Sequence, residues 1–120
     1  MMCEEGAAVR QAGSAMMTTR ELLGEIRQRL ADVHGRRLRG VVLYGSEARG
    51  QAGPESDLDI LVLLDDPVDC GHDLEANLEA LYPLSVQIGR RISALPISAR
   101  EYDTVDCPLY RAAHREGIAA

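Results

Sequence analysis

Apolar residues recur along the start of the patterned region with the period of an α-helix. Between Thr18 and Gly35 they lie three to four residues apart, which predicts one amphipathic helix. Thr18 and Glu21 form a capping box at its start, and Gly35 is suited to end it. The apolar stripe of this helix comprises Leu22, Leu23, Ile26, Leu30 and Val33.

The next segments predict strands. Residues 40–44 form a short apolar run, and residues 91–97 predict a later strand. Residues 58–64 are apolar at odd and even positions alike after Asp59, which is typical of a central strand covered on both faces. Residues 51–56 contain Gly53-Pro54 and predict a turn.

The remaining pattern predicts helices between and after these strands. Residues 73–88 have a helical pattern that Pro83 should kink and Gly89 should end. Ser98 and Glu101 form a second capping box, and residues 108–116 predict a final helix. Strands that alternate with helices in so short a chain indicate a small α/β fold. The helical positions of residues 73–88 are Leu74, Leu78, Leu81, Ser85 and Ile88.

Composition narrows this picture to one domain with an aliphatic core. The chain has 120 residues, of which 46% are hydrophobic, yet it contains no Trp or Phe and only four Tyr. A chain of this length supports a single core. Residues 1–17 mix Gly, Ala, Gln and Ser with scattered charges, so we expect a disordered leader there and a domain over residues 18–120.

Charge and cysteine content disfavour several classes of function. The net charge of -6 disfavours nucleic acid as the main partner, and the basic clusters at 36–39 and 90–91 suit solvated helix ends. Cys3, Cys70 and Cys107 are odd in number and widely spaced, which argues against a disulfide framework and a zinc site. No apolar run approaches the roughly 20 residues of a membrane helix, and no signal peptide is recognisable. We therefore expect a soluble cytoplasmic protein.

The strand at 40–44 leads directly into a loop that could cradle phosphates. Gly45 lets the backbone turn sharply and approach a ligand. Residues 46–49 can then form one helical turn, whose free N–H groups attract phosphate oxygens. The Ser46 hydroxyl adds a donor, and Arg49 suits a phosphate contact and a structural ion pair equally well.

Two carboxylates follow at the start of the central strand. Asp57 and Asp59 are two residues apart, so their side chains leave one face of the strand about 7 Å apart along it. They repel each other unless a cation lies between them, and Mg²⁺ binds carboxylates together with phosphate oxygens. Ser56 serves the turn, orients Asp57 or contacts the nucleotide.

Each motif alone has an ordinary explanation. Gly-Ser is a turn in most proteins, and Asp-x-Asp at a strand start is usually solvated or, in some sugar transferases, a metal site. Their combination, with each part tied to a hydrophobic strand, favours one nucleotide and metal site. The three histidines are isolated in sequence, so we expect helix-end or surface residues and propose none as a ligand: His34, His72 and His114.

The chain resembles the minimal nucleotidyltransferase family of the polymerase-beta-like superfamily. Gly45-Ser46, ten residues and then Asp57-Leu58-Asp59 match that family's pattern. The resemblance implies a small mixed β-sheet flanked by helices, Mg²⁺ bound by the two aspartates, and transfer of a nucleoside monophosphate, with ATP as the expected donor. It also implies a helical HEPN protein as partner, commonly in toxin–antitoxin modules, in a homo- or hetero-oligomer.

One position departs from the family's pattern. Active members usually carry a third carboxylate on the third strand, which helps to activate the acceptor hydroxyl, and here that position falls on Ser93. Three functions therefore stay open. The chain is an active Mg²⁺-dependent nucleotidyltransferase, acting on an acceptor such as a partner protein, or a non-catalytic, antitoxin-like subunit that binds nucleotide and masks a partner. In the third alternative, the acidic pair only holds a structural cation.

Overall fold

The protein is described from a computed structural model covering residues 17–51, 53 and 56–120. The apolar patterns form four strands, β1 (Leu38–Tyr44), β2 (Leu58–Leu64), β3 (Ile92–Ser98) and β4 (Ile118–Ala119). The helices are α2 (Thr19–His34), α3 (Cys70–Ile88), α4 (Ala99–Thr104) and α5 (Pro108–Glu116), with a 3₁₀ turn η1 (Gly35–Arg37) after α2. Apart from Met17, the expected leader lies outside the described residues.

The sheet is mixed, with strand order β3-β2-β1-β4. β1 runs antiparallel to both β2 and β4, whereas β2 and β3 are parallel, since the crossover helix α3 connects them. The central strand β2 is buried at five of its seven positions, as expected from its apolar run. This confirms the predicted small mixed sheet flanked by helices.

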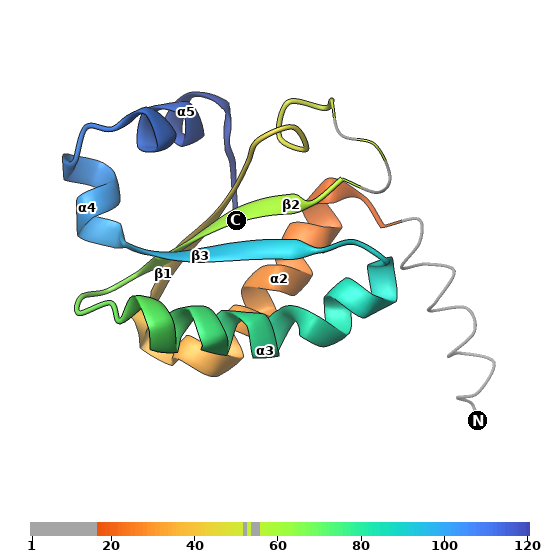
Figure 1. Ribbon diagram of the computed structural model, residues 1–120, viewed down its shortest axis with the longest axis horizontal. Coiled ribbons are helices and arrows are strands. Elements are labelled where there is room, and N and C mark those ends of the chain that lie inside the picture. Colours follow the sequence, from red (N-terminus) through yellow and green to blue (C-terminus); the bar gives the residue numbers. More distant parts are fainter. Residues whose placement is uncertain (1–16, 52, 54–55) are drawn as a thin grey trace.

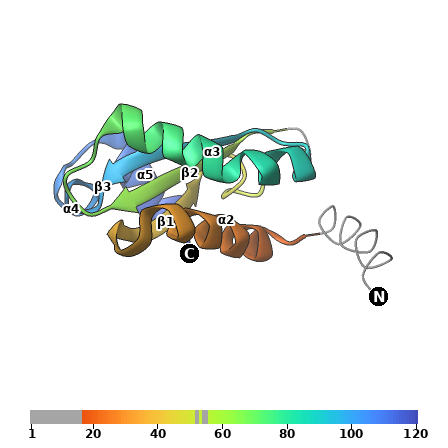
Figure 2. The ribbon, with the colours of Figure 1, turned by 90° about the horizontal axis from the view of Figure 1, so that it is seen from below.

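The helices cover the two faces of the sheet unequally. α2 and α3 lie side by side on one face, and the shorter α4 and α5 lie on the other (Figures 1 and 2). The larger cluster of buried aliphatic side chains lies beneath α2 and α3. The smaller cluster, under α4 and α5, comprises Val42, Leu61, Ile97, Tyr102 and Ala113.

Most predicted boundaries are confirmed to within a few residues. Thr18 caps α2 through a capping box with Glu21, and α5 spans the predicted 108–116. The Ser98 hydroxyl accepts a hydrogen bond from the Glu101 amide and so caps α4. α3 begins at residue 70, earlier than predicted, because Asp69 caps it, and it ends at Gly89 as expected. Pro83 lies within this helix, and the kink stays a prediction.

The buried faces of two helices differ from the predicted apolar stripes. Val33 is 47% exposed and Leu78 is 50% exposed. In α3 the predicted Leu81 is buried, and Asp73, Asn77 and Leu84 turn inward beside it. Two polar residues can occupy core positions here because both find buried partners.

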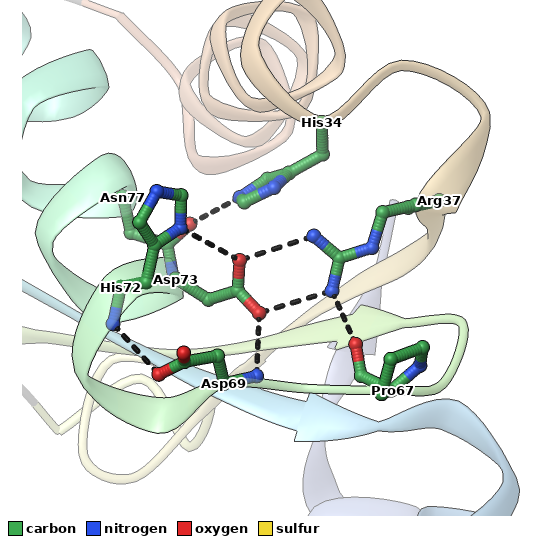
Figure 3. Close-up of polar contacts among 7 residues, drawn as sticks. All are labelled: His34, Arg37, Pro67, Asp69, His72, Asp73 and Asn77. Atoms are coloured by element: carbon green, nitrogen blue, oxygen red, sulfur yellow. Dashed lines mark hydrogen bonds and ion pairs between the residues drawn. The ribbon is translucent and has the colours of Figure 1, made fainter.

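Those partners form a polar cluster that joins α2, η1 and α3 (Figure 3), and Asn77 extends it to β3. His34 ends α2, which agrees with the expected helix-end position, but it is buried, at 8% exposed, and its Nε2 lies 2.6 Å from Asn77 Oδ1. Asn77 donates its amide to the Ala94 carbonyl, so Oδ1 is left to accept and His34 Nε2 carries the proton. Arg37 donates from Nη1 and Nη2 to the Asp73 carboxylate at 3.1 and 3.0 Å.

Within the described part of the chain, none of the helices is long and apolar enough to cross a membrane.

Candidate functional site

The candidate site lies where β1 ends and β2 begins. Antiparallel pairing places Tyr44 opposite Asp59, so the loop that starts at Gly45 lies beside the acidic pair. Gly45 has φ = 80°, and a Cβ at this position would lie 2.6 Å from Asp59 Oδ2. Only glycine allows both this left-handed conformation and this close approach.

The loop after Gly45 forms a turn, and the expected turn of helix is only partly formed. The Arg49 amide donates to the Gly45 carbonyl at 3.2 Å, and the Gln51 amide donates to the Ser46 carbonyl at 2.9 Å. Among the described residues, the amide and hydroxyl of Ser46 have no hydrogen-bond partner. These two donors beside Gly45 suit an anionic oxygen.

Asp57 and Asp59 project from the same face at the start of β2, since Leu58 between them is buried in the core. Burial raises the pKa of Asp59, and the negative charge of Asp57 raises it further. Burial, and then the charge of Asp59, likewise raises the pKa of the Tyr44 phenol. A cation bound between the carboxylates would relieve their repulsion and favour the ionised form of Asp59.

Among the residues that the structure describes, Asp57 and Asp59 are the carboxylates placed to hold such a cation, and no third one joins them. β3 runs parallel to β2 with Ser93 directly beside Asp59, where Ser93 is exposed. That Ser93 takes the position of the family's third carboxylate stays a prediction, and the register shows only that it lies beside Asp59. In the described ranges, no three His, Cys, Asp or Glu side chains are grouped to hold a metal ion.

Two predicted nucleotide-binding residues lie at the edge of this site. Arg49 is hydrogen-bonded to Gln51 at 3.1 Å and forms an ion pair with Glu116 at 3.4 Å. Of its two predicted roles, the structure shows the ion pair, and the phosphate contact stays a prediction. The Ser56 hydroxyl accepts the Gly53 amide at 3.0 Å, which stabilises the turn before Asp57.

Three charged residues near the site escaped sequence reasoning. The Arg90 guanidinium lies 2.6 Å from Glu47 in the Gly45 loop, and Arg91 lies 4.0 Å from Asp57. The Arg90 side chain is only 13% exposed, which corrects its interpretation as part of a solvated helix end. Glu47 and Arg90 are 43 residues apart, so only the fold brings them together.

Comparisons with solved structures agree with this architecture. A toxin–antitoxin crystal structure with AMP-PNP is 22% identical, with a TM-score of 0.59, covering 81% of this chain and 70% of that one. A structure of the tri-AMPylated Shewanella oneidensis HEPN toxin with MNT antitoxin is 19% identical, with a TM-score of 0.55, covering 85% and 71%. At these identities the similarity establishes the fold.

The spectinomycin adenyltransferase AAD(9) of Enterococcus faecialis, solved with ATP and spectinomycin, is 26% identical with a TM-score of 0.57. The match covers 76% of this chain but only 38% of that protein. No curated protein matches the sequence. The nucleotidyltransferase domain family matches residues 20–111. This chain therefore belongs to the nucleotidyltransferase domain family.

Proposed function

We propose that this protein is a Mg²⁺-dependent nucleotidyltransferase that transfers AMP from ATP to a hydroxyl of a partner protein. The observation that carries the proposal is the close approach of Gly45 to Asp59, where a Cβ would meet the carboxylate at 2.6 Å. This contact supports the proposal, because the loop that we propose to bind phosphate lies directly against the acidic pair. A fold that only needed a turn here would not require it.

The residues at the site divide the work of binding. Ser46, through its amide and hydroxyl, would hold phosphate oxygens of the triphosphate, and Arg49 and Ser56 border the same loop. Asp57 and Asp59 would hold Mg²⁺, which fits their shared face and the raised pKa of Asp59. When bound, Mg²⁺ neutralises charge on the phosphates during transfer.

The transfer itself is a displacement at the α-phosphorus. The acceptor hydroxyl oxygen forms a bond to this phosphorus, the bond to the bridging oxygen breaks, and pyrophosphate leaves with its electron pair. The hydroxyl proton passes to a base. Because Ser93 stands beside Asp59, this chain offers no third carboxylate there, and solvent or the acceptor protein would take the proton.

Three similar structures support the choice of donor and acceptor. One similar structure contains AMP-PNP, and another contains a tri-AMPylated HEPN toxin with its MNT antitoxin. The spectinomycin adenyltransferase shows the same fold in a protein solved with ATP. We accordingly propose a HEPN-type helical protein as the acceptor.

Ser93 favours one competing function. A serine neither accepts a proton nor binds Mg²⁺ as strongly as an aspartate would. The alternative is a non-catalytic, antitoxin-like subunit that keeps the nucleotide site and masks its partner.

The test is incubation with ATP labelled at the α-phosphate, Mg²⁺ and a lysate of the host. Wild type is compared with Asp57→Asn/Asp59→Asn and with Asp32→Asn/Asp103→Asn, which removes two exposed aspartates away from the site. The proposal expects a labelled protein with wild type and the control, and none with the site variant. Absence of label, together with Mg²⁺-dependent ATP binding and capture of a partner by the wild type, would favour the non-catalytic function.

A further inference from the structure

Arg90 joins the two halves of the candidate site. Its Nη2 donates to Glu47 Oε1 at 2.6 Å, and its Nε donates to the Ser56 carbonyl at 2.8 Å. Glu47 belongs to the Gly45 loop, and Ser56 immediately precedes Asp57. One guanidinium therefore connects the proposed phosphate-binding loop to the segment that carries the acidic pair.

A third element meets the same carboxylate. The Thr19 hydroxyl lies 3.4 Å from Glu47 Oε2, which ties the first turn of α2 to the loop. Arg90 itself follows Gly89, the left-handed residue that ends α3. The loop is thus held from α2 on one side and from the α3–β3 connection on the other.

This ion pair is shielded from water more than the others. The side chains of Arg90 and Glu47 are 13% and 18% exposed, and among the described ion pairs only this one has both side chains below one fifth. Exposed ion pairs fix the positions of their side chains only weakly, because water and salt screen the attraction. A shielded pair with a second hydrogen bond to backbone holds a fixed distance.

The charge of Glu47 gives the pair a second consequence. A carboxylate in a loop that receives a triphosphate would repel it if left unpaired. Arg90 neutralises that charge at 2.6 Å while its other edge holds Ser56. Loss of Arg90 would therefore loosen the loop and leave a negative charge beside the phosphates.

We propose that Arg90 is a positioning residue, which through Glu47 and Ser56 sets the phosphate-binding loop at the distance from Asp57 and Asp59 that one Mg²⁺–nucleotide complex requires. This proposal rests on the proposed function. It specifies how the site couples its two ligands: Mg²⁺ strengthens nucleotide binding only while the loop and the acidic pair are held together.

The experiment measures the affinity of a non-hydrolysable ATP analogue by calorimetry, with and without Mg²⁺. Arg90→Met should reduce the factor by which Mg²⁺ strengthens binding by about tenfold, the size of a lost charged hydrogen bond. Arg37→Met, which removes a guanidinium from the buried polar cluster, is the matched control and should keep that factor within about twofold. In the Arg90→Met background, Glu47→Gln should recover part of the affinity because it removes the unpaired charge.

The outcomes separate the two proposals. If wild type binds the analogue with Mg²⁺ and Arg90→Met binds it equally well, the positioning role is wrong and the proposed function stands. If wild type binds no nucleotide, both are wrong. Should Arg90→Met fail to fold, Arg90→Lys, which keeps the charge but cannot bridge both acceptors, should lower the same factor, and an unchanged factor would overturn the proposal.

Discussion

Two groups of acidic side chains lie at opposite ends of β2, and their surroundings differ. After the strand ends, Asp73 is 2% exposed and receives two hydrogen bonds from Arg37 and one from the Asp69 amide. Before and at its start, Asp57 and Asp59 face each other's charge, and Arg91 reaches Asp57 only at 4.0 Å. Asp73 is thus satisfied by hydrogen bonds within the chain, whereas no hydrogen bond from a described residue reaches the carboxylates of Asp57 and Asp59.

The pKa values express this difference. Hydrogen bonds from Arg37 hold the pKa of Asp73 at about 2, whereas burial and the Asp57 charge raise the pKa of Asp59. Ionised Asp73 therefore stabilises the fold, and ionised Asp59 costs stability until a cation arrives. A carboxylate that the fold leaves unsatisfied is the better candidate for a ligand site.

The largest expected effect on stability comes from breaking the satisfied group. Asp73→Asn should lower the free energy of unfolding by about 2 kcal/mol, because it leaves Arg37 without its charged partner in a pair whose carboxylate is buried and whose guanidinium is partly exposed. Denaturant unfolding measures this loss, with Asp32→Asn on the exposed side of α2 as the control. A loss no greater than that of the control would show that the Arg37–Asp73 pair contributes little.

A side chain at Gly45 would crowd Asp59 and should strongly reduce nucleotidyl transfer. In Gly45→Ala the new Cβ would displace the Asp59 carboxylate, and we expect transfer to fall by about 100-fold. Gly50→Ala is the matched control, since Gly50 has φ = 73° but open space around a Cβ. Equal losses in the two variants would mean that backbone strain, and not the contact with Asp59, limits the loop.

The two groups should respond to pH in opposite directions. Asp73 has a folded pKa of about 2 against an ordinary 3.8, so its contribution of about 2 kcal/mol is present above pH 3.8 and lost as the pH falls through 2. The folded pKa of Asp59 is raised, so its cost appears as the pH rises from 3.8 through the folded value. Unfolding free energies of wild type, Asp73→Asn and Asp59→Asn, measured from about pH 2 to 6, separate these contributions. If all three proteins follow the same curve, neither carboxylate has the pKa described here.

A smaller effect, an increase in the transfer rate, is expected from adding a third carboxylate on β3. Ser93→Asp places a carboxylate beside Asp59, and a base at this position should raise transfer by about tenfold. Ser93→Asn has the same size without the charge and should leave transfer unchanged. Gain in neither variant would count against a crippled enzyme and for the non-catalytic subunit.

The sequence predicts those structural features that depend on residues close together in the chain. Strand alternation was enough to place Asp57 and Asp59 on one face, and the capping box at Thr18 located the start of α2. The position of Gly45 directly after a strand predicts a sharp turn and a close approach to a ligand, and in the structure Gly45 lies close to Asp59. Which of these residues bind ligand stays a prediction.

Features built from distant residues could not be reached in this way. The His34–Asn77 and Glu47–Arg90 contacts each join residues 43 positions apart. The helix-period rule assigns apolar residues to the core, so it turned Leu78 inward where the fold turns Asn77 inward. Asn77 is buried because Ala94 on β3 and His34 on α2 satisfy it, and neither partner is visible from the local pattern.

We propose that Asp73 serves the fold and that Asp59, together with Asp57, serves a ligand. The most direct measurement compares Asp59→Asn and Asp73→Asn, each for its unfolding free energy without ligand and for Mg²⁺-dependent binding of a non-hydrolysable ATP analogue. Asp59→Asn should keep or slightly gain stability and lose the Mg²⁺ dependence, whereas Asp73→Asn should lose stability and retain binding while folded. Comparable stability losses in both variants, or undiminished Mg²⁺-dependent binding by Asp59→Asn, would show that the two aspartates do not have these separate roles.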